Sequence, residues 1–233
     1  LQKSDIPVKA AYVYLDPSRS RYYLESRTPS DALHFKKLFG PDRLAVNYSG
    51  LRYFFHPTSF SQVNESIVPT MLEQARKLLD PTPSQRLLDL YCGYGLFCHF
   101  LSSDYREVIG IDGEGPSIRF ARLNCRAGGD SKKVNFIAQR ITPHSLDNYL
   151  PSSSVPEVVL LDPPRQGPQN GVIEALCRRR PMAVLHVFCG VDQIPESLRE
   201  WKHYGYEVNR VVPMDMFPGS ANLEILILLQ PVK

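Results

Sequence analysis

The chain has 233 residues, which is enough for one large domain or for one domain with an appendage. Hydrophobic residues make up 43% and charged residues 22%, and the net charge of +3 is compatible with RNA binding without indicating it. The apolar runs are far shorter than a membrane span and no secretory signal is visible, so we expect no membrane segment.

The five cysteines are widely spaced and form no CxxC motif or Cys/His cluster. This pattern indicates neither a disulfide framework nor a metal or iron–sulfur site, and it favours an intracellular, reducing compartment. The chain begins with Leu1 rather than Met, so we expect a fragment or a processed product in which upstream domains can be missing.

Residues 1–60 differ from the rest of the chain, because short segments rich in Tyr, Val and Phe alternate there with Pro, Ser, Asp and Gly. The segments AAYVYL, RYYLES, RLAVNY and LRYFFHP predict strands, which we expect to be antiparallel. A short helix is expected at 30–39, with Ser30 as its cap. We interpret 1–60 as a β-rich N-terminal segment, part of a central domain, that packs against residues 61–233.

Residues 61–233 predict an α/β domain. Helical spacing over 67–79 precedes apolar strands that alternate with helices, a pattern typical of a mostly parallel sheet covered on both faces. The last two strands are joined by a short turn, so they predict an antiparallel hairpin. The seven expected strands cover 86–91, 107–112, 134–139, 157–162, 182–189, 206–217 and 223–230. Further helices are expected after the glycine loop CGYG and at 116–125, 170–179 and 193–204.

The stretch EVVLLDPPRQG at 157–167 predicts a buried strand that ends on Asp162. Pro163 and Pro164 cannot donate backbone hydrogen bonds and therefore end the strand, and Arg165 follows at once. Ligands of open α/β sheets lie beyond the carboxyl ends of the strands, so this corner is a candidate substrate site. The alternative is a strand that ends in a proline turn with a surface arginine.

The loop DLYCGYG is a second candidate site, because Gly93 and Gly95 lie between a predicted strand and a predicted helix. Glycines let the backbone approach a ligand, and a helix N-terminus offers free amides. Asp112 ends the next strand, where an acid can accept both hydroxyls of a ribose. The third glycine of a dinucleotide fingerprint is missing, so S-adenosylmethionine fits better than NAD. A tight strand–helix turn is the alternative.

Two further residues combine position with chemistry. Cys189 ends a predicted strand and precedes Gly190, which places it at the same sheet edge as the two candidate sites. A cysteine at that edge is a candidate nucleophile, whereas the other four are expected to pack in the core. Glu224 opens an apolar strand, where a carboxylate is costly to bury without a role or a partner. The alternatives are a structural cysteine and an exposed glutamate.

Taken together, these residues resemble the RNA uracil-5-methyltransferase family, whose members use S-adenosylmethionine to make 5-methyluridine in tRNA and rRNA. The resemblance covers residues 58–229 and rests on five motifs in order: FSQVN, LLDLYCGYG, VIGID, LLDPPRQG and, after Cys189, MDMFPGSANLE. It implies a Rossmann-like class I methyltransferase fold, S-adenosylmethionine as the cofactor, and RNA, either tRNA or rRNA, as the partner.

The resemblance also implies roles for single residues. Cys189 falls on the position of the nucleophile and Glu224 on that of the proton acceptor. The family's contacts to cofactor or substrate fall on Gln62, Tyr91, Asp112 and Asp162. In the family's chemistry a thiolate adds to carbon 6 of uracil, carbon 5 attacks the methyl group of the sulfonium, and a base removes the proton from carbon 5. We expect Cys189 to be activated by a lowered pKa.

The RNA itself adds further expectations. The target base must leave its stack to reach the site, and Phe60 is a candidate stacking platform. Asp162 and Gln62 are expected to bond the uracil edge or the cofactor. Arg165 and the arginine cluster at 178–180 are candidates for phosphate contacts. For the cluster, a solvated helix end is the preferred interpretation.

Several positions depart from the family pattern, namely Leu96, Ala138-Gln139, Gly190-Val191 and Asn222. The leading hypothesis is methyl transfer to carbon 5 of a uridine through a covalent Cys–uracil adduct. The departures favour, as an alternative, a catalytically weakened RNA-binding module of the same fold. An amino-methyltransferase acting on adenine or glutamine is disfavoured, because those enzymes prefer an aromatic residue at the position of Arg165.

Overall fold

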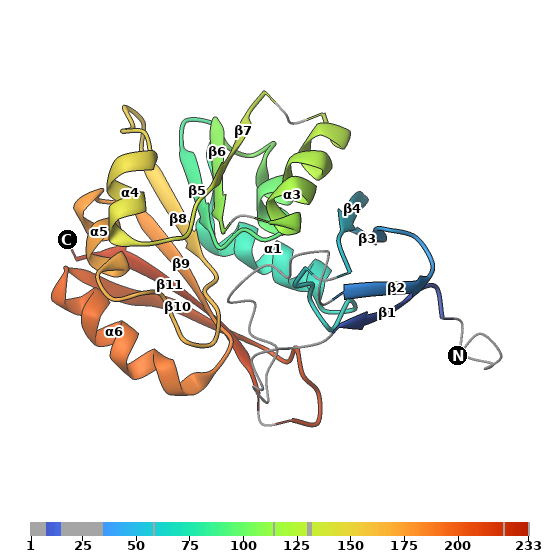
Figure 1. The fold of residues 1–233 in the computed structure, drawn as a ribbon. Coiled ribbons are helices and arrows are strands. Elements are labelled where there is room, and N and C mark those ends of the chain that lie inside the picture. Colours follow the sequence, from blue (N-terminus) through green and yellow to red (C-terminus); the bar gives the residue numbers. More distant parts are fainter. Residues whose placement is uncertain are drawn as a thin grey trace.

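The computed structural model describes residues 8–14, 35–57, 59–113, 115–129, 132–220 and 222–232 (Figure 1). Its centre is a seven-stranded sheet in the order β10-β11-β9-β8-β5-β6-β7. The strands are β5 (Arg86–Leu90), β6 (Glu107–Asp112), β7 (Val134–Ala138), β8 (Glu157–Leu161), β9 (Ala183–Phe188), β10 (Tyr206–Met214) and β11 (Glu224–Pro231). The strands from β9 to β7 are parallel, and β11 is antiparallel to both β9 and β10. The predicted fold class is therefore confirmed.

Helices cover both faces of the sheet (Figure 1). One face carries α1 (Val68–Leu79), α2 (Leu96–Leu101) and α3 (Pro116–Ala127), and the other carries α4 (Pro143–Tyr149), α5 (Val172–Arg178) and α6 (Ile194–His203). A short 3₁₀ turn, η1 (Val191–Gln193), precedes α6. All residues of β5, β8 and β9 are buried, and alternate side chains enter one of two cores. This is why these strands are mostly apolar in sequence, without the alternation of a half-buried strand.

Helix α4 is absent from the sequence expectations, although its start carries a clear signal. Thr142 caps it by accepting a hydrogen bond from the backbone N–H of Ser145 at 3.0 Å, and the Ser145 hydroxyl accepts one from the N–H of Thr142 at 2.9 Å. Pro143 occupies the first turn, where the missing N–H costs nothing. Its seven residues present too short an apolar stripe for periodicity to reveal the helix.

The N-terminal elements form two small antiparallel sheets apart from the central one. The first pairs β1 (Ala11–Tyr14) with β2 (Phe35–Phe39), and the second pairs β3 (Leu44–Tyr48) with β4 (Leu51–Phe55). The helix expected at 30–39 is wrong where the structure describes it, because pairing with β1 holds 35–39 as a strand. Residues 30–34 and the segment RYYLES lie outside the described residues.

The β3–β4 hairpin packs onto α3 and the loop before α2. Tyr53 is fully buried, and its ring meets that of Tyr94 edge-on at 6.1 Å. Asn124 of α3, also fully buried, donates from Nδ2 to the carbonyl oxygens of Phe54 and Tyr94, both at 2.9 Å. Its Oδ1 accepts from the N–H of Phe54 at 2.8 Å. One amide side chain therefore joins the hairpin, α3 and the glycine loop.

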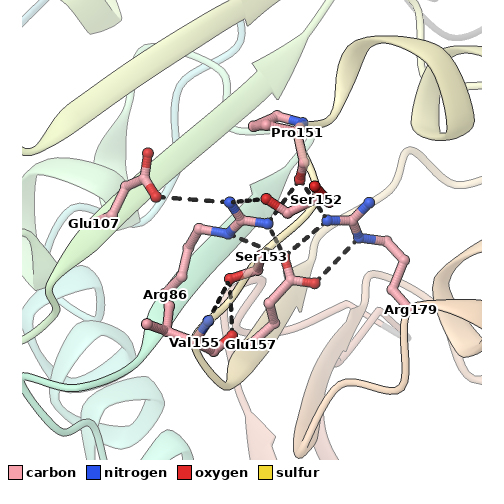
Figure 2. A network of polar contacts seen from close by, with 8 residues as sticks. All are labelled: Arg86, Glu107, Pro151, Ser152, Ser153, Val155, Glu157 and Arg179. Carbon is pink, nitrogen blue, oxygen red and sulfur yellow. Dashed lines mark hydrogen bonds and ion pairs between the residues drawn. The ribbon is translucent and has the colours of Figure 1, made fainter.

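A buried ionic network lies at the amino ends of β5 and β8 (Figure 2). Arg86 and Glu157, the first residues of these strands, pair in register, and the Arg86 Nε donates to Glu157 Oε1 at 3.0 Å. Arg179 donates to the same oxygen at 2.8 Å, while Arg178 is paired with Asp147 at 2.8 Å. The structure thus engages two arginines of the cluster at 178–180 with carboxylates at the edge away from the predicted sites.

In the ranges given above, no helix is long and apolar enough to span a bilayer. The same residues hold no group of three or more His, Cys, Asp and Glu side chains that is arranged to bind a metal ion.

Candidate active site

Five ionisable side chains lie at the carboxyl edge of the parallel strands, one on each of five neighbouring strands. Asp112 ends β6, Asp89 is the penultimate residue of β5, Asp162 and Cys189 directly follow β8 and β9, and Glu224 opens β11. Strand residues alternate between faces, and these five share the parity of the residues that pack toward α1, α2 and α3. The fold therefore gathers them in one row on one face, which we call the edge row.

Cys189 and Glu224 are neighbours across the β9–β11 ladder. Ile225 pairs with Phe188, so the next step of this antiparallel register sets Glu224 opposite Cys189. Glu224 is 4% exposed, and its Oε2 has no hydrogen-bond partner among the described residues. Burial raises the pKa of Glu224 to about 7, against a smaller lowering by Arg165. A carboxyl group with this pKa can take up or release a proton near neutral pH.

The protonation state of Cys189 differs from the expectation. Burial, together with the nearby carboxyl groups of Asp162 and Glu224, raises the pKa of Cys189 to about 11. The expected lowering of this pKa is therefore wrong, because burial and negative neighbours oppose a thiolate more strongly than Arg165 and a backbone hydrogen bond favour it. Burial and the neighbouring Glu224 also raise the pKa of Asp162 well above its usual range. The raised pKa values favour the protonated forms of Cys189, Asp162 and Glu224.

Arg165 is the positively charged residue that acts on both Cys189 and Glu224. Its side chain is exposed, and Cζ lies 6.0 Å from the ring centroid of Phe217, on the loop that leads to Glu224. Its charge lowers the pKa of both Cys189 and Glu224. The two prolines before it end β8, so a rigid corner carries this charge to the edge row.

The glycine loop and Asp112 form one hydrogen-bonded unit. Asp112 accepts from the N–H of Gly93 and from that of Gly113, both at 2.6 Å. Gly93 has φ 54°, and a Cβ added there would meet nothing within 4 Å, so its backbone faces open space. Gly95 has φ 81°, and an added Cβ would lie 3.1 Å from the Cβ of Ala121 on α3. One glycine therefore leaves room for a ligand and the other permits close helix packing.

Asp89 is a member of the edge row to which the sequence reasoning assigned no role. It is fully buried; Oδ2 accepts from the N–H and the Sγ of Cys98, both at 3.0 Å, whereas Oδ1 has no partner among the described residues. Burial raises the pKa of Asp89 to about 7. The signal was available, since an acid inside the apolar run RLLDLY, four residues before Gly93, is costly to bury without a role.

Three other residues were predicted to belong to the site: Tyr91, Gln62 and Phe60. Tyr91 takes φ 64° directly after β5, and burial, aided by Asp112, raises its pKa to about 12. Gln62 is buried, and within the described residues its Oε1 has no partner. Phe60 is 56% exposed, as a stacking platform would be. The roles of all three stay predictions.

Comparison with solved structures defines the class of protein. The fold is similar to that of the tRNA (uracil-54, C5)-methyltransferase of Pyrococcus abyssi, solved in complex with S-adenosyl-L-homocysteine, with a TM-score of 0.68. At 24% identity the match covers 87% of this chain and 48% of that one. The fold is thus that of a Rossmann-like methyltransferase.

Sequence comparison narrows the class to a family. The sequence profile of the tRNA (Uracil-5-)-methyltransferase family matches residues 21–232, so the chain belongs to this family. The chain is 34% identical over 184 residues to the 23S rRNA (uracil(1939)-C(5))-methyltransferase RlmD of Alkalilimnicola ehrlichii, covering 78% of the chain and 40% of that protein. RlmD of Marinomonas sp. is 33% identical over 183 residues, with 78% and 41% covered. The chain spans less than half of the length of these relatives.

Proposed function

We propose that the chain transfers a methyl group from S-adenosylmethionine to carbon 5 of a uridine in RNA. The observation that carries this proposal is the register of β9 and β11, which sets a thiol and a buried carboxyl group opposite each other at the ligand-binding edge. Two groups of these types, on two paired strands, suit a reaction that opens with nucleophilic addition and closes with proton removal. Family membership supports the same reaction.

The residues present fit the cofactor. Asp89 Oδ1 is a buried acceptor with no partner among the described residues, Gly93 opens onto free space, and Asp112 is an acid beside its amide. Such a donor and acceptor set suits the hydroxyls of a ribose and a cationic amino-acid group. We assign Gly93 and Asp112 to the nucleoside, with Gly95 shaping the loop and Tyr91 and Gln62 beside it. When bound, the cofactor supplies an electrophilic methyl group.

The chain's own residues handle the protons. In our proposal the Cys189 thiol loses its proton to solvent and Sγ bonds to carbon 6 of the uracil, so the C5–C6 π bond opens into an enolate that makes carbon 5 nucleophilic. After methylation Glu224 removes the proton of carbon 5, and Sγ leaves. Because burial and two carboxyl neighbours raise the pKa of Cys189, a positive charge is needed to favour the thiolate, and Arg165 is placed to provide part of it. Asp162 is assigned to the uracil edge.

A second candidate function is an RNA-binding module with weak catalysis. The raised pKa of Cys189 favours it, because little thiolate exists near neutral pH. Leu96, one of the departures from the family pattern, is 5% exposed and packs in the core, so its side chain offers nothing polar to a ligand.

One experiment separates the two candidates. The purified chain is incubated with labelled S-adenosylmethionine and either unmodified tRNA or 23S rRNA transcripts, and the nucleosides are then analysed by mass spectrometry. Formation of 5-methyluridine with multiple turnovers supports the enzyme. RNA binding without 5-methyluridine on either transcript would support the RNA-binding module. A methylated adenosine would contradict both candidate functions.

A further inference from the structure

The edge of the sheet formed by β7, with the helix α3 that covers it, carries the excess positive charge of the chain. Residues 115–140 contain six Lys and Arg side chains and one Asp, a formal charge of +5. The whole chain carries +3, so all other residues together sum to −2. A separation of charge like this is the footprint of a surface that binds a polyanion.

Three of these cations form a stripe along α3. Arg119, Arg122 and Arg126 are spaced i, i+3 and i+7, which places them on one face of the helix. The opposite face holds Asn124, buried against the β3–β4 hairpin. Arg119 and Arg126 are exposed, while Arg122 donates to the carbonyl oxygen of Phe136 at 3.1 Å. The stripe therefore faces the free edge of β7.

A hollow accompanies the stripe. It measures about 240 Å³ and lies between α3 and β7, where Arg122, Arg126 and Asn135 line it. Lys132 and Lys133 are exposed and lead into the start of β7 at the same end. Among the described residues, no acidic side chain lines this hollow or forms an ion pair with Arg126 or the two lysines. Arg126 and the two lysines are exposed and so can be reached from solvent.

Two arginines elsewhere on the protein already have carboxylate partners. Arg76 is paired with Asp104 at 2.9 Å, and Arg178 with Asp147 at 2.8 Å. These side chains already have carboxylate partners, and a phosphate would have to displace them. The contrast singles out the α3–β7 edge, even though the triple arginine at 178–180 is the more conspicuous cluster in the sequence.

The charged edge leads to the candidate active site. β7 lies next to β6, which ends on Asp112, and the glycine loop lies on the far side of Asp112. Arg140, exposed just after β7, is close enough to lower the pKa of Tyr91 in that loop. Figure 1 shows α3 and β7 together on one flank, with β10 and α6 on the other. A strand of RNA lying along this edge would reach the edge row.

We propose that this basic flank, formed by Arg119, Arg122, Arg126, Lys132, Lys133 and Arg140, binds the sugar–phosphate backbone of the RNA whose uridine enters the active site. The inference rests on the proposed function for the identity of the polyanion. Lys and Arg contacts to phosphates supply affinity and position the nucleic acid, whereas they carry no sequence information. The flank would therefore act in docking and not in the choice of uridine.

The test compares two triple variants of the full chain. The flank variant carries Arg119→Gln, Arg126→Gln and Lys133→Gln, and it leaves Arg122 in place because its bond to β7 supports the fold. The control carries Arg199→Gln, Lys202→Gln and Arg210→Gln, three exposed cations of α6 and β10. Both remove two arginines and one lysine. Fluorescence anisotropy with unmodified tRNA and 23S rRNA transcripts over a salt series gives affinity and salt slope, and calorimetry with S-adenosylmethionine checks the fold.

The flank variant should bind RNA roughly tenfold or more weakly near physiological salt, with a slope of log K against log salt smaller by about 2. The control should change affinity less than threefold, and both should bind S-adenosylmethionine like the wild type. Equal losses in the two variants, or a wild type that binds neither RNA at low salt, would overturn the flank. A wild type that binds RNA through the flank but transfers no methyl group would refute the proposed function and leave the flank standing.

Discussion

Glu224 and Cys189 each lie one residue beyond the last pair of the β11–β9 ladder, Ile225 and Phe188, so an extension of its register sets them opposite each other. Directly opposed residues of an antiparallel ladder have Cβ atoms about 4.5–5.5 Å apart. Burial and, to a smaller extent, the carboxyl groups of Asp162 and Glu224 raise the pKa of the Cys189 thiol. A single backbone ladder thus fixes the spacing of the two groups that we assign to the start and the end of the reaction.

The first prediction is that substitutions of Cys189 and Glu224 block the reaction at different steps. Cys189→Ala should abolish 5-methyluridine formation and leave no covalent RNA adduct, because the nucleophile is gone. Glu224→Gln keeps size and polarity but cannot take the proton, so a methylated protein–RNA adduct should accumulate. Denaturing gel electrophoresis with labelled RNA detects the adduct.

The double variant is the control for that assignment. Cys189→Ala in the Glu224→Gln background should remove the adduct band. Glu224→Gln with turnover near that of the wild type would mean that Glu224 is only a residue at the start of a strand. Methyl transfer by Cys189→Ala would remove the nucleophile assignment.

The second prediction concerns stability against pH. Burial raises the pKa of Glu224 from 4.5 to about 7, so the folded state holds a proton that the unfolded state releases. This contribution to stability is complete below pH 4.5 and is lost as the pH rises through about 7. Glu224→Gln removes the ionisation. Its unfolding free energy relative to that of the wild type should therefore increase by roughly 2–3 kcal/mol as the pH rises from 5 to 8.5. Urea unfolding at several pH values measures this, and a difference independent of pH would contradict the buried carboxyl.

Most of the fold follows from local patterns in the sequence. The strands β5, β8 and β9 are buried on both faces, so their apolar runs were sufficient to predict a parallel sheet with helices on both sides. β2 was mistaken for part of a helix because FKKLF has no strand alternation, and only its pairing with β1 makes it a strand. α4 was missed because it depends on a cap and not on a long apolar stripe.

The positions of the site residues can be predicted from the sequence, but their protonation states cannot. Strand ends placed Asp112, Asp162 and Cys189 at one edge, because parallel strands share their carboxyl ends. The pKa of Cys189 could not be predicted in this way, since it depends on burial and on carboxyl groups that other strands bring close. For Asp89 the apolar run RLLDLY indicates a buried acid, but which of its oxygens lacks a partner among the described residues is visible only in three dimensions.

The third prediction tests the glycine loop. Asp112→Ala should weaken S-adenosylmethionine binding by roughly 1.5–3 kcal/mol, the scale of charge-assisted hydrogen bonds. Asp112→Asn keeps an acceptor for the N–H of Gly93 and should lose less, which separates the order of the loop from direct contact with the ribose. Calorimetry measures both variants. Wild-type affinity in Asp112→Ala would place the cofactor elsewhere.

The fourth prediction concerns the amide that joins the hairpin to the loop. Asn124→Asp keeps the acceptor for Phe54 but turns the Nδ2 donor into an oxygen facing the carbonyl oxygens of Phe54 and Tyr94. It should cost roughly 2–4 kcal/mol of unfolding free energy, because two buried acceptors lose their donor. Tyr53→Phe is the milder control, since it removes one 3.3 Å bond to the Leu96 carbonyl. Equal unfolding free energies for the two variants in urea would show that Asn124 does not join these elements.

The fifth prediction separates the stability of the sheet from its chemistry. Arg86 and Glu157 are 3% and 7% exposed, and Glu157→Gln would leave Arg86 buried with Glu107, at 3.6 Å, as its remaining charged partner among the described residues (Figure 2). Removing one member of a buried pair costs roughly 3–5 kcal/mol. Glu174→Gln breaks the exposed pair with Arg178, whose side chains are 46% and 48% exposed, and should cost less than about 1 kcal/mol.

Both variants, where folded, should bind S-adenosylmethionine with wild-type affinity, because this network lies at the amino ends of the strands and the edge row at their carboxyl ends. Urea unfolding measures the loss of stability, and calorimetry measures the affinity for S-adenosylmethionine. A Glu157→Gln protein that unfolds at the same urea concentration as Glu174→Gln would mean that Arg86 finds other partners when Glu157 is neutral. A loss of cofactor affinity confined to Glu157→Gln would mean that the two ends of the sheet are coupled.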